Sequence, residues 1–245
     1  MADAMNTVKR PVAIVTGVGS PLGAAIVRKL IGRGFDIAAV DLRASWCDTS
    51  LGDASADRVR IRAFGADLRY LHEAEAMVLR VAEAMGPPSV VVNAPFPGRA
   101  GIVSELPEWE SVVHARLRAP LLVSRAAERH LAASGDGRIV NVLQTGGTGR
   151  HRPDDLVIRE TLRAMTETLA KELGPQGVVV NTIVTEVDCP TRTGESARDC
   201  CVVAEERTAS KVEFLVSDAV DGVSGQMIES PHPMRTSTPA RDTLR

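Results

Sequence analysis

The chain has 245 residues, which is enough for one large domain or two small ones. Its 29 basic and 31 acidic residues give a net charge of −2, and this balance argues against nucleic acid as a partner, because nucleic-acid binding needs a concentrated positive surface. No apolar run approaches the roughly 18–20 residues that cross a bilayer, and residues 1–10 lack the apolar region of a secretory signal. Four cysteines without metal-ligand spacing predict no disulfide scaffold and no metal site. We therefore expect a cytoplasmic protein without a membrane partner.

Short apolar runs alternate with helical patterns along most of the chain. The runs predict strands over 11–16, 36–40, 59–64, 89–92, 137–143, 177–184 and 226–229. Helices are expected over 24–34, 72–85, 109–130 and 158–173, with a last helix beginning near Lys211. Apolar strands that alternate with helices are typical of a parallel sheet covered on both faces. We expect an α/β, Rossmann-like doubly wound parallel sheet of about seven strands, with a single domain over 1–230 and a flexible C-terminal tail over 231–245.

A glycine-rich turn, TGVGSPLG over residues 16–23, joins the first predicted strand to the first helix. Gly17 can adopt a positive φ and let a phosphate approach the backbone. A helix beginning near Pro21 presents free N–H groups and the positive end of its dipole to a pyrophosphate. Gly23 permits close packing of the helix and the strand. The turn therefore favours dinucleotide binding, and the alternative is a tight turn without a ligand.

Asp41 lies 24 residues after Gly17, at the end of the second predicted strand. A carboxylate at this place can accept hydrogen bonds from the ribose diol of adenosine, and it repels a 2′-phosphate. NAD is therefore favoured over NADP. Arg43 argues the other way, because a guanidinium two residues further on could hold that phosphate. Asp41 could also be no more than a solvated strand end.

Seven groups of residues follow one another in a characteristic order. They are TGVGSPLG (16–23), ADL (66–68), VNAP (92–95), GRIVNVL (137–143), LAKEL (169–173), VNTI (180–183), and FLVSD with SGQ (214–218 and 224–226). In this order and at this spacing they resemble the short-chain dehydrogenase/reductase family over roughly residues 10–230. The resemblance implies an NAD(P)-binding protein. It also implies that the cofactor contacts Gly17, Ser20, Leu22, Gly23, Asp41, Asp67, Leu68, Asn93 and Ala94.

The family transfers a hydride between nicotinamide and a carbonyl or alcohol, and it uses an asparagine, a serine and a YxxxK pair. Counting from the matching groups puts the tyrosine and lysine positions at Asp155 and Arg159. The serine position falls near Gln144 and the asparagine position on Arg116. All four positions therefore carry other residues. The one tyrosine of the chain, Tyr70, falls in the adenine-contacting region.

These replacements predict the loss of the family's proton transfer. A phenol with its pKa near 10 can be tuned toward neutrality, whereas a carboxylate beside a guanidinium stays ionised at pH 7 and is a poor acid for an alkoxide. Asp155 and Arg159 are four residues apart, so on a helix we expect them to form an ion pair with each other. Glu186 replaces a glycine that the family places against the nicotinamide, and the lid region 191–211 is short and polar.

Two functions remain open. The first is a non-catalytic or regulatory subunit, a pseudoenzyme that binds NAD(P) and associates through the helices of 109–130 and 158–173. Its partner would be a second copy or an active relative. The alternative is an active oxidoreductase or lyase with a changed constellation, in which Asp155 or His151 acts as base and Arg159, Arg116 and Gln144 orient a small anionic substrate.

Overall fold

The computed structural model describes residues 10–51, 59–95, 106–146, 153–187 and 195–230. The predicted tail over 231–245 and His151 lie outside these ranges. Within them, no helix combines the length and the apolarity that a bilayer-spanning segment needs.

One sheet of seven parallel strands forms the centre of the fold, in the order β3-β2-β1-β4-β5-β6-β7. It is the doubly wound α/β fold that the alternation of apolar runs predicts. The strands are β1 (Val12–Thr16), β2 (Asp36–Asp41), β3 (Ile61–Gly65), β4 (Pro88–Asn93), β5 (Gly137–Gly146), β6 (Val178–Val187) and β7 (Met227–Ser230).

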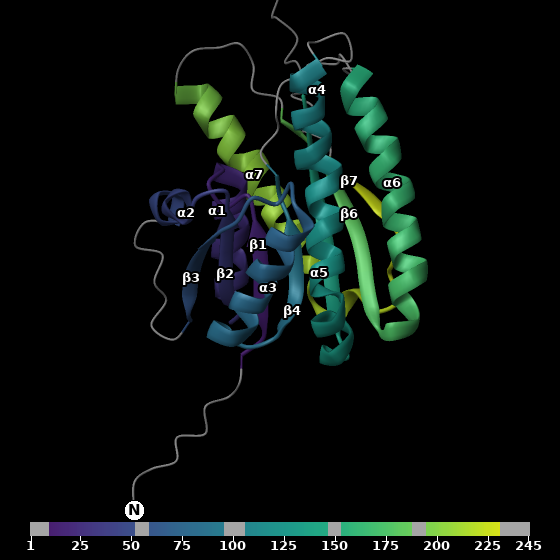
Figure 1. Ribbon diagram of the computed structural model, residues 1–245. Helices are drawn as coiled ribbons and strands as arrows, with labels where there is room; N and C mark the ends of the chain where they lie inside the picture. The colour runs from purple at the N-terminus through teal and green to yellow at the C-terminus, as the bar shows by residue number, and fades with distance from the viewer. Residues whose placement is uncertain (1–9, 52–58, 96–105, 147–152, 188–194, 231–245) are drawn as a thin grey trace, which may run out of the picture.

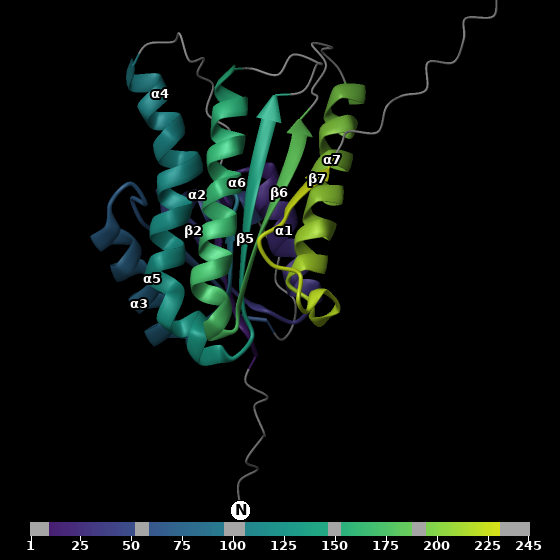
Figure 2. The same ribbon diagram turned by 90° about the vertical axis from the view of Figure 1, so that its right-hand side faces the viewer.

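Helices cover both faces of this sheet (Figures 1 and 2). Successive side chains of a strand point to opposite faces, which is why the central strands β1, β2 and β4 are mostly apolar. In β1, Ala13 and Val15 pack in one buried cluster with α1 and α7, whereas Val12 and Ile14 pack in a second cluster with α3, α5 and α6. The helices are α1 (Pro21–Gly32), α3 (Leu71–Met85), α5 (Ala119–Ser134), α6 (Pro153–Leu173) and α7 (Glu195–Leu215), with 3₁₀ turns at Gly174–Gln176 and Asp218–Val220.

The long helix predicted over 109–130 is divided in three. It consists of α4 (Leu106–Val113), a π-helical turn η1 (His114–Arg118) and α5. Pro120 stands at the second position of α5, where its missing N–H removes one hydrogen bond of the preceding turn. The wider π turn accommodates that loss, and such turns often mark functional sites. Arg116 lies within this turn.

Two helices differ from the sequence-based expectation. The last helix, α7, begins at Glu195 and not near Lys211. The hydrophobic periodicity of α7 is weak in the sequence because α1 covers only one side of the helix. Ala209 and Val212 are buried, whereas Val202 and Val203 are about half exposed. An eight-residue helix, α2 (Ala44–Leu51), was not predicted, and Cys47 is its one buried residue.

The chain changes direction across the sheet at β1. It leaves β1 for α1 on one face and leaves the neighbouring β4 for α4 and α5 on the other face. The two connections diverge and leave a crevice at the carboxyl ends of β1 and β4, which is where open α/β sheets bind their ligands.

Candidate functional site

A cleft of about 350 Å³ lies at this switch point. Its walls come from the carboxyl ends of β1, β2 and β3, from η1 and from the start of α5. Four of the predicted cofactor residues line it, namely Gly17, Asp41, Asp67 and Leu68. The other five lie beside or beneath it, since Ser20, Leu22, Gly23, Asn93 and Ala94 are all buried.

The glycine turn has the conformation that phosphate binding requires. Gly17 has a φ of 73°, and a Cβ there would lie 2.1 Å from the Ala94 carbonyl oxygen, so only glycine fits. Ser20 caps α1, since its Oγ donates to the Gly17 carbonyl over 2.8 Å and accepts from the Gly23 N–H over 3.0 Å. Pro21 has no N–H, which leaves the N–H of Leu22 as the donor of the first turn for an anion.

Asp41 is fixed at the edge of the cleft by the backbone. Its Oδ2 accepts from the Gly19 N–H over 2.9 Å, and its Oδ1 accepts from the Leu42 N–H over 2.7 Å. These bonds hold a negative charge where the sugar next to a bound pyrophosphate would lie. The Arg43 guanidinium, in contrast, lies over the Trp46 ring at 5.6 Å from its centroid.

A second carboxylate, that of Asp67, also lines the cleft. The neighbouring Arg69 donates to it from Nε over 2.8 Å and from Nη2 over 2.5 Å, and this bonding lowers the pKa of Asp67. The Arg69 guanidinium also lies over the ring of Tyr70, which is about half exposed at the N-terminus of α3. The one tyrosine therefore lies next to Arg69, although it is not among the residues that line the cleft.

A buried polar row lies under the floor of the cleft. Thr16, Asn93 and Asn141 occupy matching positions on β1, β4 and β5. Asn93 Nδ2 donates to Asn141 Oδ1 over 3.0 Å, and Thr16 Oγ1 approaches Asn93 Oδ1 at 3.5 Å. These bonds tie together the strand ends that carry the glycine turn.

Two of the predicted tetrad positions come together as an ion pair. Arg116 on η1 donates from Nη1 to Asp155 Oδ1 on α6 over 2.8 Å, and each residue is only 5% exposed. Gln144 is also buried, on β5, where it is in register with Thr185 of β6. The predicted base His151 and the side chain of Glu186 lie outside the described part of the chain.

The expected ion pair between Asp155 and Arg159 is wrong. Arg159 projects from α6 to the edge of the sheet, where its Nη2 pairs with the Glu229 carboxylate of β7. Arg159 lies four positions after Asp155 and therefore on the same face of α6. Different elements pack against that face at the two residues, however: η1 contacts α6 at Asp155, and β7 contacts it at Arg159.

The cleft residues that were missed from the sequence include Leu42, Arg69 and His114. Leu42 and Arg69 each follow a predicted cofactor residue within two positions, so their place in the sequence could have predicted that they line the cleft. No sequence pattern predicted His114 in the cleft, because it lies there only through the π turn that interrupts the predicted helix.

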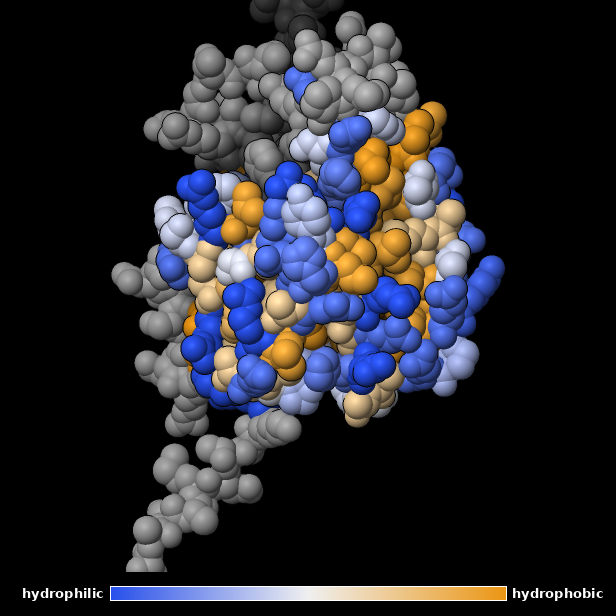
Figure 3. All heavy atoms as spheres, viewed as in Figure 1, coloured by the Kyte–Doolittle hydropathy of each residue, from blue (hydrophilic) through white to orange (hydrophobic). Residues whose placement is uncertain are grey.

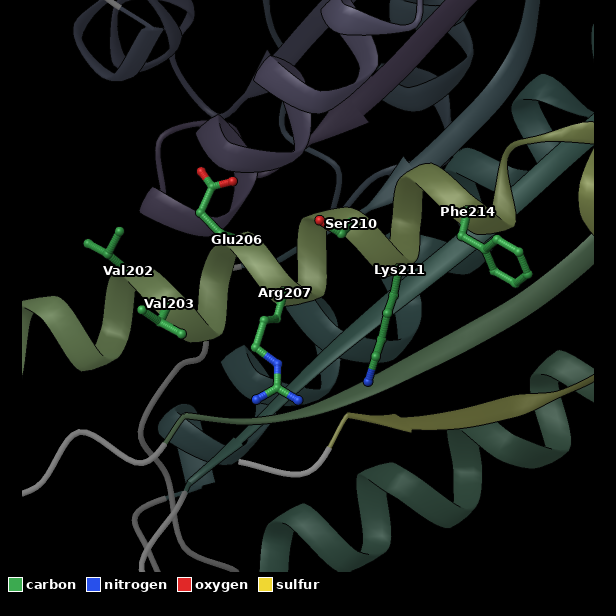
Figure 4. Close-up of a pocket in the computed structure, with 7 residues that line it drawn as sticks. All are labelled: Val202, Val203, Glu206, Arg207, Ser210, Lys211 and Phe214. Carbon is green, nitrogen blue, oxygen red and sulfur yellow. The ribbon is translucent and has the colours of Figure 1, made fainter. Parts of the chain in front are cut away.

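A second hollow, of about 520 Å³, follows α7 and is lined by that helix alone (Figure 4). Arg207 and Lys211 point from α7 toward β7, and Lys211 Nζ donates to the Glu229 carbonyl over 3.2 Å. The hollow contains none of the predicted site residues. Within the described ranges, no group of three or more His, Cys, Asp or Glu side chains is placed to hold a metal ion. The cleft at the glycine turn is therefore the candidate site.

Comparisons with known proteins identify the family of the chain. The family model for short chain dehydrogenases matches residues 11–199. The chain is 30% identical over 188 residues to the short-chain reductase protein NovJ of Streptomyces niveus, covering 74% of this chain and 72% of that protein. It is also 30% identical over 176 residues to D-threitol dehydrogenase of Mycolicibacterium smegmatis, covering 70% and 68%.

Solved structures show the same fold. An actinorhodin polyketide ketoreductase with NADPH has a TM-score of 0.76 at 24% identity, over 91% of this chain and 96% of that one. The 3-ketoacyl-(acyl-carrier-protein) reductase of Brucella melitensis with NADH has a TM-score of 0.74 at 22% identity, over 91% and 97%. The chain belongs to the short-chain dehydrogenase/reductase family of NAD(P)-binding oxidoreductases.

Proposed function

We propose that this protein binds NAD(H) in the cleft and has lost tyrosine-dependent hydride transfer, so that it acts as a non-catalytic or regulatory subunit. The observation that carries the proposal is the buried ion pair between Arg116 and Asp155. By the spacing of the sequence motifs, these residues occupy the asparagine and tyrosine positions of the family. An ion pair at that place bonds the Asp155 carboxylate to a guanidinium and puts no phenolic proton donor where the family has its tyrosine.

Tyr70 does not replace the missing phenol. It lies at the start of α3 beside Arg69 and His72, with a ring-to-ring distance of 5.7 Å to His72. Tyr70 is not among the residues that line the cleft, and its described ring contacts are with Arg69 and His72 rather than with Arg116 or Asp155. These contacts support the proposal that the phenol takes no part in hydride transfer.

The Asp41 carboxylate supports a preference for NAD over NADP. Both of its oxygens accept hydrogen bonds from backbone N–H groups. Rotating the carboxylate away from a ligand would break these two hydrogen bonds. A 2′-phosphate would meet this fixed negative charge. Arg43, the residue that could offset the repulsion, lies over Trp46.

Exposed apolar side chains on α5 and α6 support the proposal of a partner surface. Leu121, Leu156 and Val157 are 40%, 56% and 43% exposed, and Figure 3 shows hydrophobic side chains gathered on the face that these helices present. Exposed apolar patches of this kind often mark protein interfaces. We propose that a second copy or an active relative covers them, in the reducing cytoplasm that the cysteine usage predicts.

The alternative, an active enzyme with a changed constellation, fits the contacts less well. Its proposed anchor for an anionic substrate, Arg159, pairs with Glu229 of β7. Arg116 is bonded to Asp155, so the proposed base and its proposed orienting cation are bound to each other.

Fluorescence titration with NADH and NADPH, followed by a carbonyl-substrate screen, tests the proposal. Trp46 lies beside Asp41 and Gly19 and provides a local reporter. We expect NADH to bind more tightly than NADPH and no carbonyl to be reduced. Turnover with any carbonyl or alcohol would contradict the loss of chemistry, and absence of dinucleotide binding by the folded protein would contradict the site itself.

A further inference from the structure

The charged side chains of α7 are divided between two sides of the helix, one toward α1 and one toward β7. On the side toward α1, Glu206 lies 3.6 Å from Arg28 and 3.5 Å from Lys29. Further along α7, Glu213 accepts from Arg33 Nε over 2.7 Å. These acids of α7 are therefore engaged by the basic side chains of α1.

Two cations lie on the side toward β7, in the hollow that α7 lines (Figure 4). Arg207 and Lys211 are four positions apart, so they share a face of the helix. Lys211 Nζ donates to the Glu229 carbonyl, which uses one of its three N–H groups. Burial lowers the pKa of Lys211, and the like charge of Arg207 lowers it further. Within the described part of the chain, no carboxylate lies within salt-bridge distance of either cation.

Apolar side chains lie at both ends of this cationic pair. Val203 precedes Arg207 by four positions, and Phe214 follows Lys211 by three, so the four residues form one stripe along α7. Val203 and Phe214 are each 53% exposed. The α7 stripe of Val203, Arg207, Lys211 and Phe214 is about 17 Å long at the rise of an α-helix.

The shape and charge of the hollow favour another helix as its occupant. Because α7 alone lines the hollow, no second wall encloses a small molecule there. A second copy packed by two-fold symmetry would place the stripe against itself, so Arg207 and Lys211 would face the same cations. Such a juxtaposition of like charges is unfavourable. An amphipathic helix with carboxylates between two apolar side chains has the complementary pattern.

We propose that the α7 stripe is a docking surface for an acidic amphipathic helix of a partner protein. Two carboxylates of that helix pair with Arg207 and Lys211, and its apolar side chains cover Val203 and Phe214. The hollow and the dinucleotide cleft share no lining residue, so this interaction does not depend on the proposed dinucleotide function. It is also separate from the apolar surface on α5 and α6.

The test measures binding of a defined peptide by fluorescence anisotropy. The probe is a fluorescein-labelled, alanine-based helix of 16 residues with leucine at its positions 2 and 13 and glutamate at its positions 6 and 10. A second peptide has glutamine in place of both glutamates. Titrations use the full chain, the double variant Arg207→Gln, Lys211→Gln, and Lys171→Gln. Lys171 is the matched control, an exposed cation of α6 outside the hollow.

We expect the unmodified chain and Lys171→Gln to bind the glutamate peptide about tenfold more tightly than the glutamine peptide, since each exposed ion pair contributes up to about 1 kcal/mol. The double variant should lose this preference. Circular dichroism establishes that each variant is folded, and NADH affinity should be the same in all of them.

Three results would overturn the proposal. The first is equal affinity for the two peptides, or no binding, in the unmodified chain. The second is a chain that sediments as a dimer and becomes a monomer in Val203→Ser, which would assign the hollow to a second copy. The third is peptide binding that occurs only after removal of residues 231–245, which would assign the hollow to that segment.

Discussion

Arg116 of η1 and Asp155 of α6 are 39 positions apart in the chain, and their side chains meet over 2.8 Å with each residue 5% exposed. The contact joins the π turn to the first turns of the helix that covers β5 and β6. Taking two charges out of water is costly, and here the cost is offset by a direct, charge-assisted hydrogen bond.

Breaking this pair should destabilise the fold. Asp155→Ala leaves the Arg116 guanidinium buried without that carboxylate, and we expect a loss of about 3–5 kcal/mol in the free energy of unfolding. The double variant Arg116→Met, Asp155→Leu removes both charges and should lose much less. Urea denaturation measures both, and equal losses in the two variants would contradict a buried pair.

Substitution of Gly17 should weaken dinucleotide binding. A Cβ at this residue would lie 2.1 Å from the Ala94 carbonyl oxygen, at a positive φ of 73°. We expect Gly17→Ala to bind NADH at least about tenfold more weakly, because a shift of the turn by one ångström misplaces its N–H groups. Gly32→Ala is the control, since a Cβ there has nothing within 4 Å. Equal NADH affinity in the two variants would place the phosphates elsewhere.

Removal of the Asp41 carboxylate should change the cofactor preference. Asp41→Ala loses both the ribose acceptor and the charge that faces a 2′-phosphate. We expect the ratio of NADPH to NADH affinity to rise by about tenfold, which corresponds to about 1.4 kcal/mol. Asp48→Ala, an exposed acid of α2, should leave the ratio unchanged. A ratio that moves equally in both variants would indicate a general charge effect.

Glu205 of α7 should make stability depend on pH. Burial raises the pKa of its carboxyl, with Arg28 opposing that shift. Because the folded pKa lies above the unfolded one, the stabilising contribution is complete below the unfolded pKa and is lost as pH rises through the folded pKa. Glu205→Gln should therefore gain stability relative to the unmodified chain between pH 4 and pH 7. Urea titrations at both pH values check this, with exposed Glu75→Gln expected to shift stability by less than about 0.5 kcal/mol at either pH.

Local signals in the sequence were sufficient for the sheet and for the phosphate turn. Mostly apolar runs predicted the central strands within a few residues, because a strand buried on both faces needs apolar side chains at most positions. The edge strands β3 and β7, which carry Arg62 and Glu229, are less buried. The turn at Gly17 was also predictable from local sequence. Its positive φ and the nearby Ala94 carbonyl restrict the position to glycine. The absence of a second tyrosine is likewise visible in the sequence alone.

Only the tertiary structure decided which charges meet. Helical spacing pairs Asp155 with Arg159, yet Asp155 is bound by Arg116 of η1 and Arg159 by Glu229 of β7. The spacing of two residues on one helix fixes their separation, whereas their partners depend on what packs against each turn of that helix. The same holds for His114, which enters the cleft through a π turn, and for Arg69, whose guanidinium folds back on Asp67. Long-range packing selects among the contacts that local geometry permits.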